Sequence, residues 1–206
     1  MIFDSFKDIF LKKILFQTKE IGHYFDSFDK NNLTRWCKQG VLVKLRNGFY
    51  SFPEYLKNQE ATFYIANRIY PFSYISLHSA LFYHGFVTNP LMNQISSVGG
   101  KKTMDFKNHF GKFNYQSMKD SLLFGYQYVN KNNTTFLMAT PEKAILDLFY
   151  LYPHYYDTVQ GIRHFALEEQ KLYEELNLHL LVEYLHQFNN VSLEKRVGIF
   201  VDVYEL

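Results

Sequence analysis

The sequence predicts an α+β fold, on three observations. The first 40 residues contain three short amphipathic segments, and a hairpin signal follows them. Residues 94–139 hold five short segments of alternating polarity, separated by Gly, Lys or Asn, which is typical of an antiparallel sheet. Residues 140–206 return to helical spacing, so we expect helices packed on that sheet.

The N-terminal part is expected to begin with two helices. Residues 5–16 carry apolar side chains at helical spacing, which predicts an amphipathic first helix. Thr18 offers a side-chain acceptor ahead of a short second helix over residues 19–25. The polar stretch 27–29 then interrupts the helical pattern and separates the second helix from the next one.

A third helix over residues 30–39 has two chemically different faces. Asp29 is expected to cap it and Gly40 to end it, because glycine tolerates the left-handed conformation common at helix ends. Leu33, Trp36 and Cys37 share the apolar face. The opposite face carries side chains that recognise DNA, namely Asn31, Thr34, Arg35 and Lys38. Arg suits the acceptor pair of guanine, Asn pairs with adenine, and Thr and Lys hold phosphates.

A β-hairpin over residues 41–52 follows, with its turn at Asn47-Gly48. Three helices and a hairpin form a winged helix-turn-helix, so the sequence predicts that the hairpin is a wing. Lys44, Arg46 and Asn47 are expected to touch backbone phosphate or the minor groove there.

The charge distribution supports a nucleic-acid partner for this part of the chain. The formal net charge is only +2, but residues 30–46 contain five basic side chains and no acidic one. Residues 140–206, by contrast, hold eleven acidic and five basic side chains. We therefore expect double-stranded DNA to bind the N-terminal part rather than the C-terminal part.

Three stretches resemble a known family, the AbiEi antitoxins of type IV abortive-infection toxin-antitoxin systems. Residues 33–52 resemble the family's recognition helix and wing, including a Gly-aromatic-Tyr pattern at Gly48, Phe49 and Tyr50. Residues 74–86 are similar to a serine- and alanine-leucine-containing helix closed by glycine. The residues matched there are Ser76, Ser79, Ala80, Leu81 and Gly85. Residues 139–151 carry the third likeness, at a similar spacing from the second.

The resemblance implies a sequence-specific autorepressor that binds inverted repeats in its own operator. It also implies a partner gene for a nucleotidyltransferase-like toxin, which the C-terminal part counteracts without a tight complex. Such a protein is expected in the cytoplasm, and the sequence has neither an export signal nor a stretch apolar enough to span a membrane.

The remaining segments complete the expected architecture. The polar, proline-led stretch 53–60 marks a boundary between a winged-helix domain, 1–56, and a mixed α+β domain, 57–206. Further helices are expected from start and stop residues: 61–70 ended by Pro71, 77–85 capped by Ser76, 141–152 capped by Thr140, and two more near 177–188 and 193–204. The expected strands are 94–100, 102–106, 111–116, 122–129 and 134–139.

The sequence favours a non-enzyme without cofactor or metal. VGGKK at 98–102 lacks the first glycine of a phosphate-binding loop, so Lys101 and Lys102 are expected at a hairpin tip. His78 and His84 lack metal-ligand spacing, and one cysteine, Cys37, cannot build a cysteine-rich zinc site.

Other interpretations remain open. Asp147 lies among apolar residues, where a structural hydrogen bond is favoured over an acid-base role with Glu142 and Lys143. The many Phe and Tyr residues are expected mostly in the core rather than in base stacking. A winged helix that docks a protein, or a regulator of transcription without a toxin partner, remains an alternative.

Overall fold

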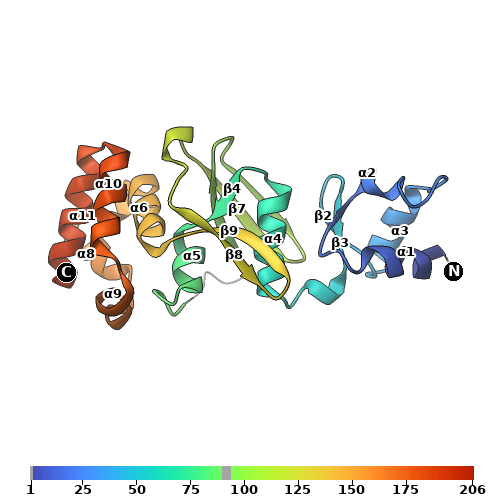
Figure 1. Cartoon of the computed structure of the whole chain (residues 1–206), viewed down its shortest axis with the longest axis horizontal. Helices are drawn as coiled ribbons and strands as arrows, with labels where there is room; N and C mark the ends of the chain where they lie inside the picture. The colour runs from blue at the N-terminus through green and yellow to red at the C-terminus, as the bar shows by residue number, and fades with distance from the viewer. Residues whose placement is uncertain (1, 90–93) are drawn as a thin grey trace.

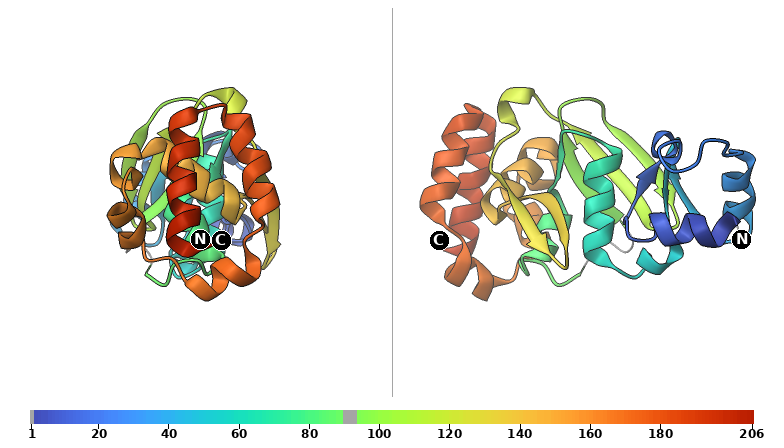
Figure 2. Two further views of the ribbon diagram at one scale, coloured as in Figure 1. Left: turned by 90° about the vertical axis from the view of Figure 1, so that its left-hand side faces the viewer. Right: turned by 45° about the vertical axis from the view of Figure 1, so that its right-hand side comes forward.

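The computed structural model describes residues 2–89 and 94–206 and shows a mixed α+β protein. Its elements form three regions along one long axis: an N-terminal unit, a central sheet with helices, and a group of helices that ends the chain (Figure 1). The two termini lie at opposite ends of that axis, as the turned view also shows (Figure 2).

The N-terminal unit combines three helices with a small sheet. Its antiparallel strands run in the order β1-β3-β2. Its core is largely aromatic: Phe6, Phe10 and Phe16 are fully buried, and the ring centres of Phe6 and Trp36 lie 4.8 Å apart. The elements are α1 (Ile2–Phe10), β1 (Phe16–Gln17), α2 (Thr18–Ile21), α3 (Asn31–Lys38), β2 (Val43–Arg46) and β3 (Phe49–Ser51).

The first two helices are shorter than the sequence predicts. α1 ends at Phe10 instead of continuing to residue 16, because the chain turns there and Phe16 pairs with Tyr50 as part of β1. α2 ends at Ile21, and its first turn is closed by Glu20, whose carboxylate accepts the Gln17 N–H at 2.8 Å. Thr18 is therefore the first helical residue rather than the cap.

The central sheet has six strands in the order β6-β7-β5-β4-β9-β8. The expectation of a purely antiparallel sheet is wrong, because β5 pairs with β7 and β4 with β9 in parallel. The sequence prediction also lacked β4, a three-residue strand that is buried throughout and so shows no alternation. The strands are β4 (Ser73–Ile75), β5 (Gln94–Gly99), β6 (Met104–Asn108), β7 (Gly111–Ser117), β8 (Tyr126–Lys131) and β9 (Thr134–Ala139).

Two further corrections concern the ends of these strands. β5 and β6 are separated in the sheet by β7, so Lys101 and Lys102 lie in a crossover loop and not at a hairpin tip. Residues 122–125 are not part of β8, because a 3₁₀ turn, η2 (Asp120–Leu122), and Gly125 with φ +68° precede it.

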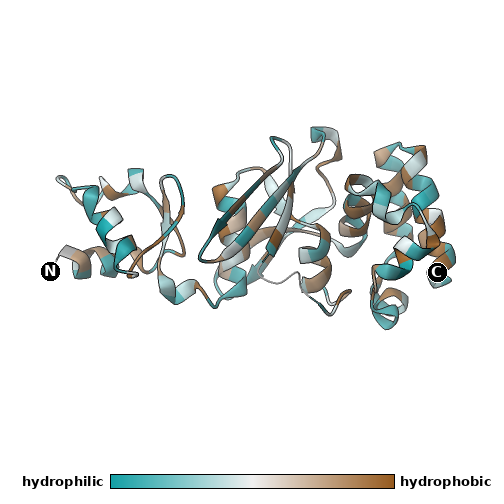
Figure 3. Ribbon diagram, turned by 180° about the vertical axis from the view of Figure 1, so that it is seen from behind, coloured by the Kyte–Doolittle hydropathy of each residue, from teal (hydrophilic) through white to brown (hydrophobic). Residues whose placement is uncertain are grey.

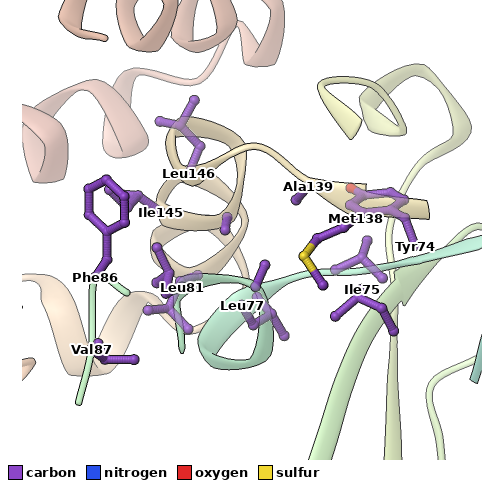
Figure 4. Close-up of a cluster of buried hydrophobic side chains, with 14 of the residues drawn as sticks. Tyr74, Ile75, Leu77, Leu81, Phe86, Val87, Met138, Ala139, Ile145 and Leu146 are labelled. Atoms are coloured by element: carbon purple, nitrogen blue, oxygen red, sulfur yellow. The ribbon is translucent and has the colours of Figure 1, made fainter. Parts of the chain in front are cut away.

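Helices flank the sheet and continue into the C-terminal region. α4 (Gln59–Ile69) packs against β9 and β4, and Asn58 caps it by accepting the Ala61 N–H. α6 (Pro141–Leu151) packs on α5 (Leu77–Tyr83); Ile145 of α6 lies beside Phe86, whereas Leu146 points away from α5 (Figure 4). Thr140 caps α6 as expected, accepting the Lys143 N–H at 3.3 Å.

The C-terminal helices are amphipathic and include three that the sequence prediction lacked. α10 and α11 lie near their expected positions and show hydrophilic and hydrophobic sides along their turns (Figure 3). The short helices between α6 and α10 hold only one to two turns, too few for a clear periodic pattern. The remaining helical elements are η1 (Pro53–Tyr55), α7 (Pro153–Tyr156), α8 (Val159–His164), α9 (Glu169–Glu175), α10 (Leu178–Phe188) and α11 (Val191–Tyr204).

Candidate nucleic-acid interface

The apolar and polar faces of α3 are separated as the sequence predicts. Leu33 and Trp36 are 2% and 3% exposed and face the aromatic core, whereas Cys37 is only half-buried. The four residues expected in the major groove are all exposed, and at about 100° per residue they lie within roughly a third of the helix circumference. These residues are Asn31, Thr34, Arg35 and Lys38.

Neighbouring polar groups fix the start of this helix. The N-cap position is Lys30 and not Asp29 as expected, but the Asp29 carboxylate accepts the Asn31 N–H at 2.9 Å and so satisfies one donor of the first turn. Arg35 Nη2 donates to Asn32 Oδ1 at 2.7 Å, which restricts the guanidinium to one side of the helix. Asn32 was not among the expected site residues. Its spacing three residues before Arg35 on a helix is the signal that identifies it.

The hairpin presents all three of its expected residues to solvent, since Lys44, Arg46 and Asn47 are exposed. The turn is fixed to α2, since the Thr18 N–H donates to the Gly48 carbonyl at 2.9 Å. Gly48 has a φ of +80°, in the left-handed region that glycine tolerates best, whereas Asn47 is not among the residues with positive φ.

Arg46, unlike Lys44 and Asn47, has its guanidinium engaged by other residues of the chain that the structure describes. Its Nη1 donates to the Ile69 carbonyl at 3.1 Å, and its guanidinium lies 6.0 Å from the centre of the Phe106 ring. The pairing of β2 with β3 shifts register between Lys44 and Arg46, although the alternation of buried and exposed side chains along β2 continues through Arg46. Through its contacts with Ile69 and Phe106, Arg46 joins the hairpin to the central region.

Other contacts strengthen the same junction. Asn108 Nδ2 donates to the Leu45 carbonyl at 3.1 Å. Val43 and Leu45 are 4% and 3% exposed and belong to the hydrophobic cluster of the central region rather than to that of the N-terminal unit. The hairpin is therefore packed between α3 on one side and the sheet on the other.

The basic side chains divide into paired and unpaired groups. Lys7 and Lys13 form ion pairs with Glu54 and Glu20 at 2.5 and 2.6 Å. Within residues 2–89 and 94–206, the basic side chains of α3, the hairpin and the residue before α3 form no ion pair with a described residue: Lys30, Arg35, Lys38, Lys44 and Arg46, the last of which donates to a backbone carbonyl. Lys30 precedes α3 directly and was not among the expected site residues. These charges are available to a polyanion.

The half-buried thiol of Cys37 is not a reactive group in this surface. Burial raises its pKa, and the nearby positive charge of Lys44 opposes that shift without cancelling it. The thiol is therefore protonated near neutral pH.

The candidate acid-base residues of α6 form a buried network instead of an open site. Lys143 forms an ion pair with Asp147, and both side chains are 0% exposed. Asp147 Oδ2 also accepts from Tyr74 and Ser76 at 2.9 and 2.8 Å. Burial lowers the pKa of Lys143 and raises that of Asp147, while their mutual attraction opposes both shifts. The expected structural role of Asp147 agrees with this geometry.

This network also explains two differences from the sequence prediction. The Ser76 hydroxyl donates to Asp147 and so does not cap α5, although Ser76 occupies the N-cap position. Glu142 is separate from Lys143 and Asp147, because its carboxylate accepts the Asn177 N–H at 2.9 Å. His84 is likewise engaged, with Nε2 2.9 Å from the Ala139 carbonyl.

No protein-family model matches the chain, and no curated protein matches it. Among the helices that the structure describes, none is long and apolar enough to cross a membrane. In the same described residues, no three His, Cys, Asp or Glu side chains are grouped as a metal site requires.

Proposed function

We propose that this protein binds double-stranded DNA through a winged helix-turn-helix over residues 1–56. The element order helix, strand, helix, helix, strand, strand supports this proposal, as does the small sheet in the order β1-β3-β2. The observation that carries it is the exposed face of α3, where Asn31, Thr34 and Arg35 point away from the buried Trp36. In helix-turn-helix proteins such a face enters the major groove.

The proposed roles follow from side-chain chemistry. Arg35 and Asn31 read base edges, while Thr34 and Lys38 hold phosphates on either side. Lys44 and Asn47 contact the adjacent backbone or minor groove from the hairpin. Arg46 positions the hairpin through Ile69 and Phe106, so we assign it no phosphate.

We further propose that the protein represses its own operon as the antitoxin of a type IV toxin-antitoxin pair. This part rests on the resemblance of residues 33–52, 74–86 and 139–151 to AbiEi antitoxins. In this proposal the DNA is an operator with inverted repeats. The C-terminal domain, 57–206, counteracts a nucleotidyltransferase-like toxin without a tight complex, and the protein itself catalyses no reaction.

A reporter fused to the protein's own upstream region tests repression and neutralisation separately. The wild type is expected to repress the reporter and to rescue growth when the neighbouring gene is expressed. Arg35→Ala is expected to lose repression and keep rescue, because the substitution lies outside residues 57–206. The proposal is contradicted if Arg35→Ala keeps both repression and rescue, or if the wild type does not repress the reporter.

A further inference from the structure

A pocket of about 540 Å³ opens on the central sheet, away from the proposed DNA surface. It is lined by β4 and the residue before it, by the loop that connects β5 to β6, by the segment that precedes β8, and by β8 and β9. Its volume is in the range of about 300–1,000 Å³ that small-molecule sites occupy. The residues that matter for its chemistry are Phe72, Tyr74, Lys101, Asp120, Tyr126 and Tyr128.

Three aromatic rings at this pocket are exposed to solvent, in a protein that buries most of its large apolar side chains. Phe72, Tyr128 and Tyr126 are 79%, 73% and 41% exposed. Phe72 is held there by a backbone φ of +65°, a conformation that a bulky side chain rarely adopts. Exposed aromatic surface of this kind is typical of a binding site.

The floor of the pocket is rigid. Tyr126 stacks on Tyr74, with ring centres 4.7 Å apart and planes inclined by 21°. The Tyr74 hydroxyl is fixed from below, because it donates to Asp147 at 2.9 Å and accepts from Lys143 at 3.0 Å. The buried network of α6 therefore holds an aromatic stack whose outer side remains open to a planar ligand.

Two opposite charges flank the aromatic rings. The Lys101 ammonium lies 5.5 Å from the centre of the Phe72 ring. The Asp120 carboxylate lies against Gly100, where a side-chain carbon would collide with its Oδ1 atom. Neither charge forms an ion pair with another residue in the part of the chain that the structure describes. Both are thus available to a ligand.

We propose that this pocket binds a guanine nucleotide. The base stacks on the Tyr126 and Tyr128 rings, as nucleobases do on exposed aromatic side chains. The Asp120 carboxylate, which only accepts hydrogen bonds, takes the two adjacent N–H donors on the Watson–Crick edge of guanine. Lys101 neutralises the phosphate.

The other bases match Asp120 less well. Adenine and cytosine each present one amino donor beside a ring nitrogen that is itself an acceptor, and that acceptor repels a carboxylate. Uracil and thymine present a single donor between two carbonyl acceptors. The pocket chemistry therefore favours guanine, and this inference does not depend on DNA binding by the N-terminal unit.

Isothermal titration calorimetry of the full chain with GMP, guanosine and AMP tests the proposal. GMP is expected to bind at least about tenfold more tightly than AMP. Lys101→Ala is expected to weaken GMP and leave guanosine unchanged, whereas Lys102→Ala, a neighbouring exposed lysine outside the pocket, leaves both unchanged. Asp120→Asn is expected to remove the preference for GMP over AMP.

Tyr128→Ala supplies the test of stacking, and circular dichroism confirms that each variant is folded. This substitution is expected to weaken GMP and guanosine equally, by about tenfold or more, since each stacked base contributes about 1–3 kcal/mol. Absence of measurable GMP binding by the wild type overturns the proposal. The proposal is also overturned if Lys101→Ala and Lys102→Ala weaken GMP binding equally, or if Asp120→Asn keeps the preference for GMP over AMP.

Discussion

At the scale of single residues, Arg35 is the most informative side chain of the proposed interface. It is exposed, forms no ion pair with a described residue and is oriented by Asn32. Arg35→Ala is expected to cost about 1–3 kcal/mol of operator affinity and to relax specificity at one base pair. Competition binding with single-base operator variants measures this. Lys57→Ala, an exposed lysine outside the interface, is the control, and an equal loss in both variants counts against base reading.

The Lys143–Asp147 pair gives a residue-scale prediction about stability. Lys143→Met or Asp147→Leu alone is expected to lower the free energy of unfolding by about 3–5 kcal/mol, because each leaves a buried group without its partner. The double variant is expected to lose less than either single variant. Urea unfolding measures all three.

An exposed pair with the same spacing provides the control for that experiment. Lys171 and Glu175 are also four residues apart on a helix, but their side chains are 36% and 50% exposed. Lys171→Met is expected to change stability by less than about 1 kcal/mol. Additive losses at Lys143 and Asp147 would show that the buried pair is not a coupled unit.

At the scale of elements, two residues of the hairpin β2–β3 are expected to have different roles. Lys44 contacts DNA, whereas Arg46 holds the hairpin against the central region. Lys44→Ala is expected to reduce the slope of log affinity against log salt by about 1, as loss of one phosphate contact does. Arg46→Ala is expected to leave that slope unchanged and to lower stability by about 1 kcal/mol, because Arg46 bonds to Ile69. Fluorescence anisotropy at several salt concentrations and urea unfolding give the two readouts. A smaller slope of log affinity against log salt in Arg46→Ala would contradict a purely structural role of Arg46.

The first turn of α2 predicts a pH dependence. Burial tends to raise the pKa of Glu20, but hydrogen bonds from Lys13 and Gln17 outweigh it and lower the pKa below its ordinary value of 4.5. Since the folded-state pKa is depressed, the stabilisation is present above pH 4.5 and is lost as the pH falls through the folded value. Glu20→Gln is therefore expected to melt earlier than the wild type at pH 7, by a margin that shrinks as the pH falls below 4.5.

The fluorescence of Trp36, the single tryptophan, reports this melting because Trp36 lies in the core of the N-terminal unit. Glu183→Gln, at an exposed position of α10, is the control. A difference between Glu20→Gln and wild type that stays constant as the pH is lowered from 7 to below 4.5 contradicts the assigned cause.

At the scale of the whole molecule, the structural features that depend on residues close together in the sequence could be predicted. The bounds of α3, the turn at Gly48 and the cap at Thr140 follow from side chains within a few positions of each other. The exposed face of α3 was predictable for the same reason, since helical spacing alone separates Arg35 from Trp36.

The features that the sequence did not reveal depend on distant contacts. β4 can be recognised as a strand only from its pairing with β5 and β9. The parallel pairing of β5 with β7 can be predicted only if β6 is known to lie at the edge of the sheet. The contacts of Arg46 with Ile69 and Phe106 could not be predicted, because these partners are remote in sequence. The aromatic pocket likewise joins Phe72, Lys101 and Tyr128 from separate segments.

The central claim is sequence-specific DNA binding by the N-terminal unit. Fluorescence anisotropy with the upstream duplex and a scrambled duplex, over a range of salt concentrations, tests it most directly. We predict tighter binding to the upstream duplex, with log affinity falling linearly with log salt at a slope of about −2.7 if Lys30, Lys38 and Lys44 each neutralise one phosphate. Equal affinity for both duplexes with no salt dependence would contradict the account.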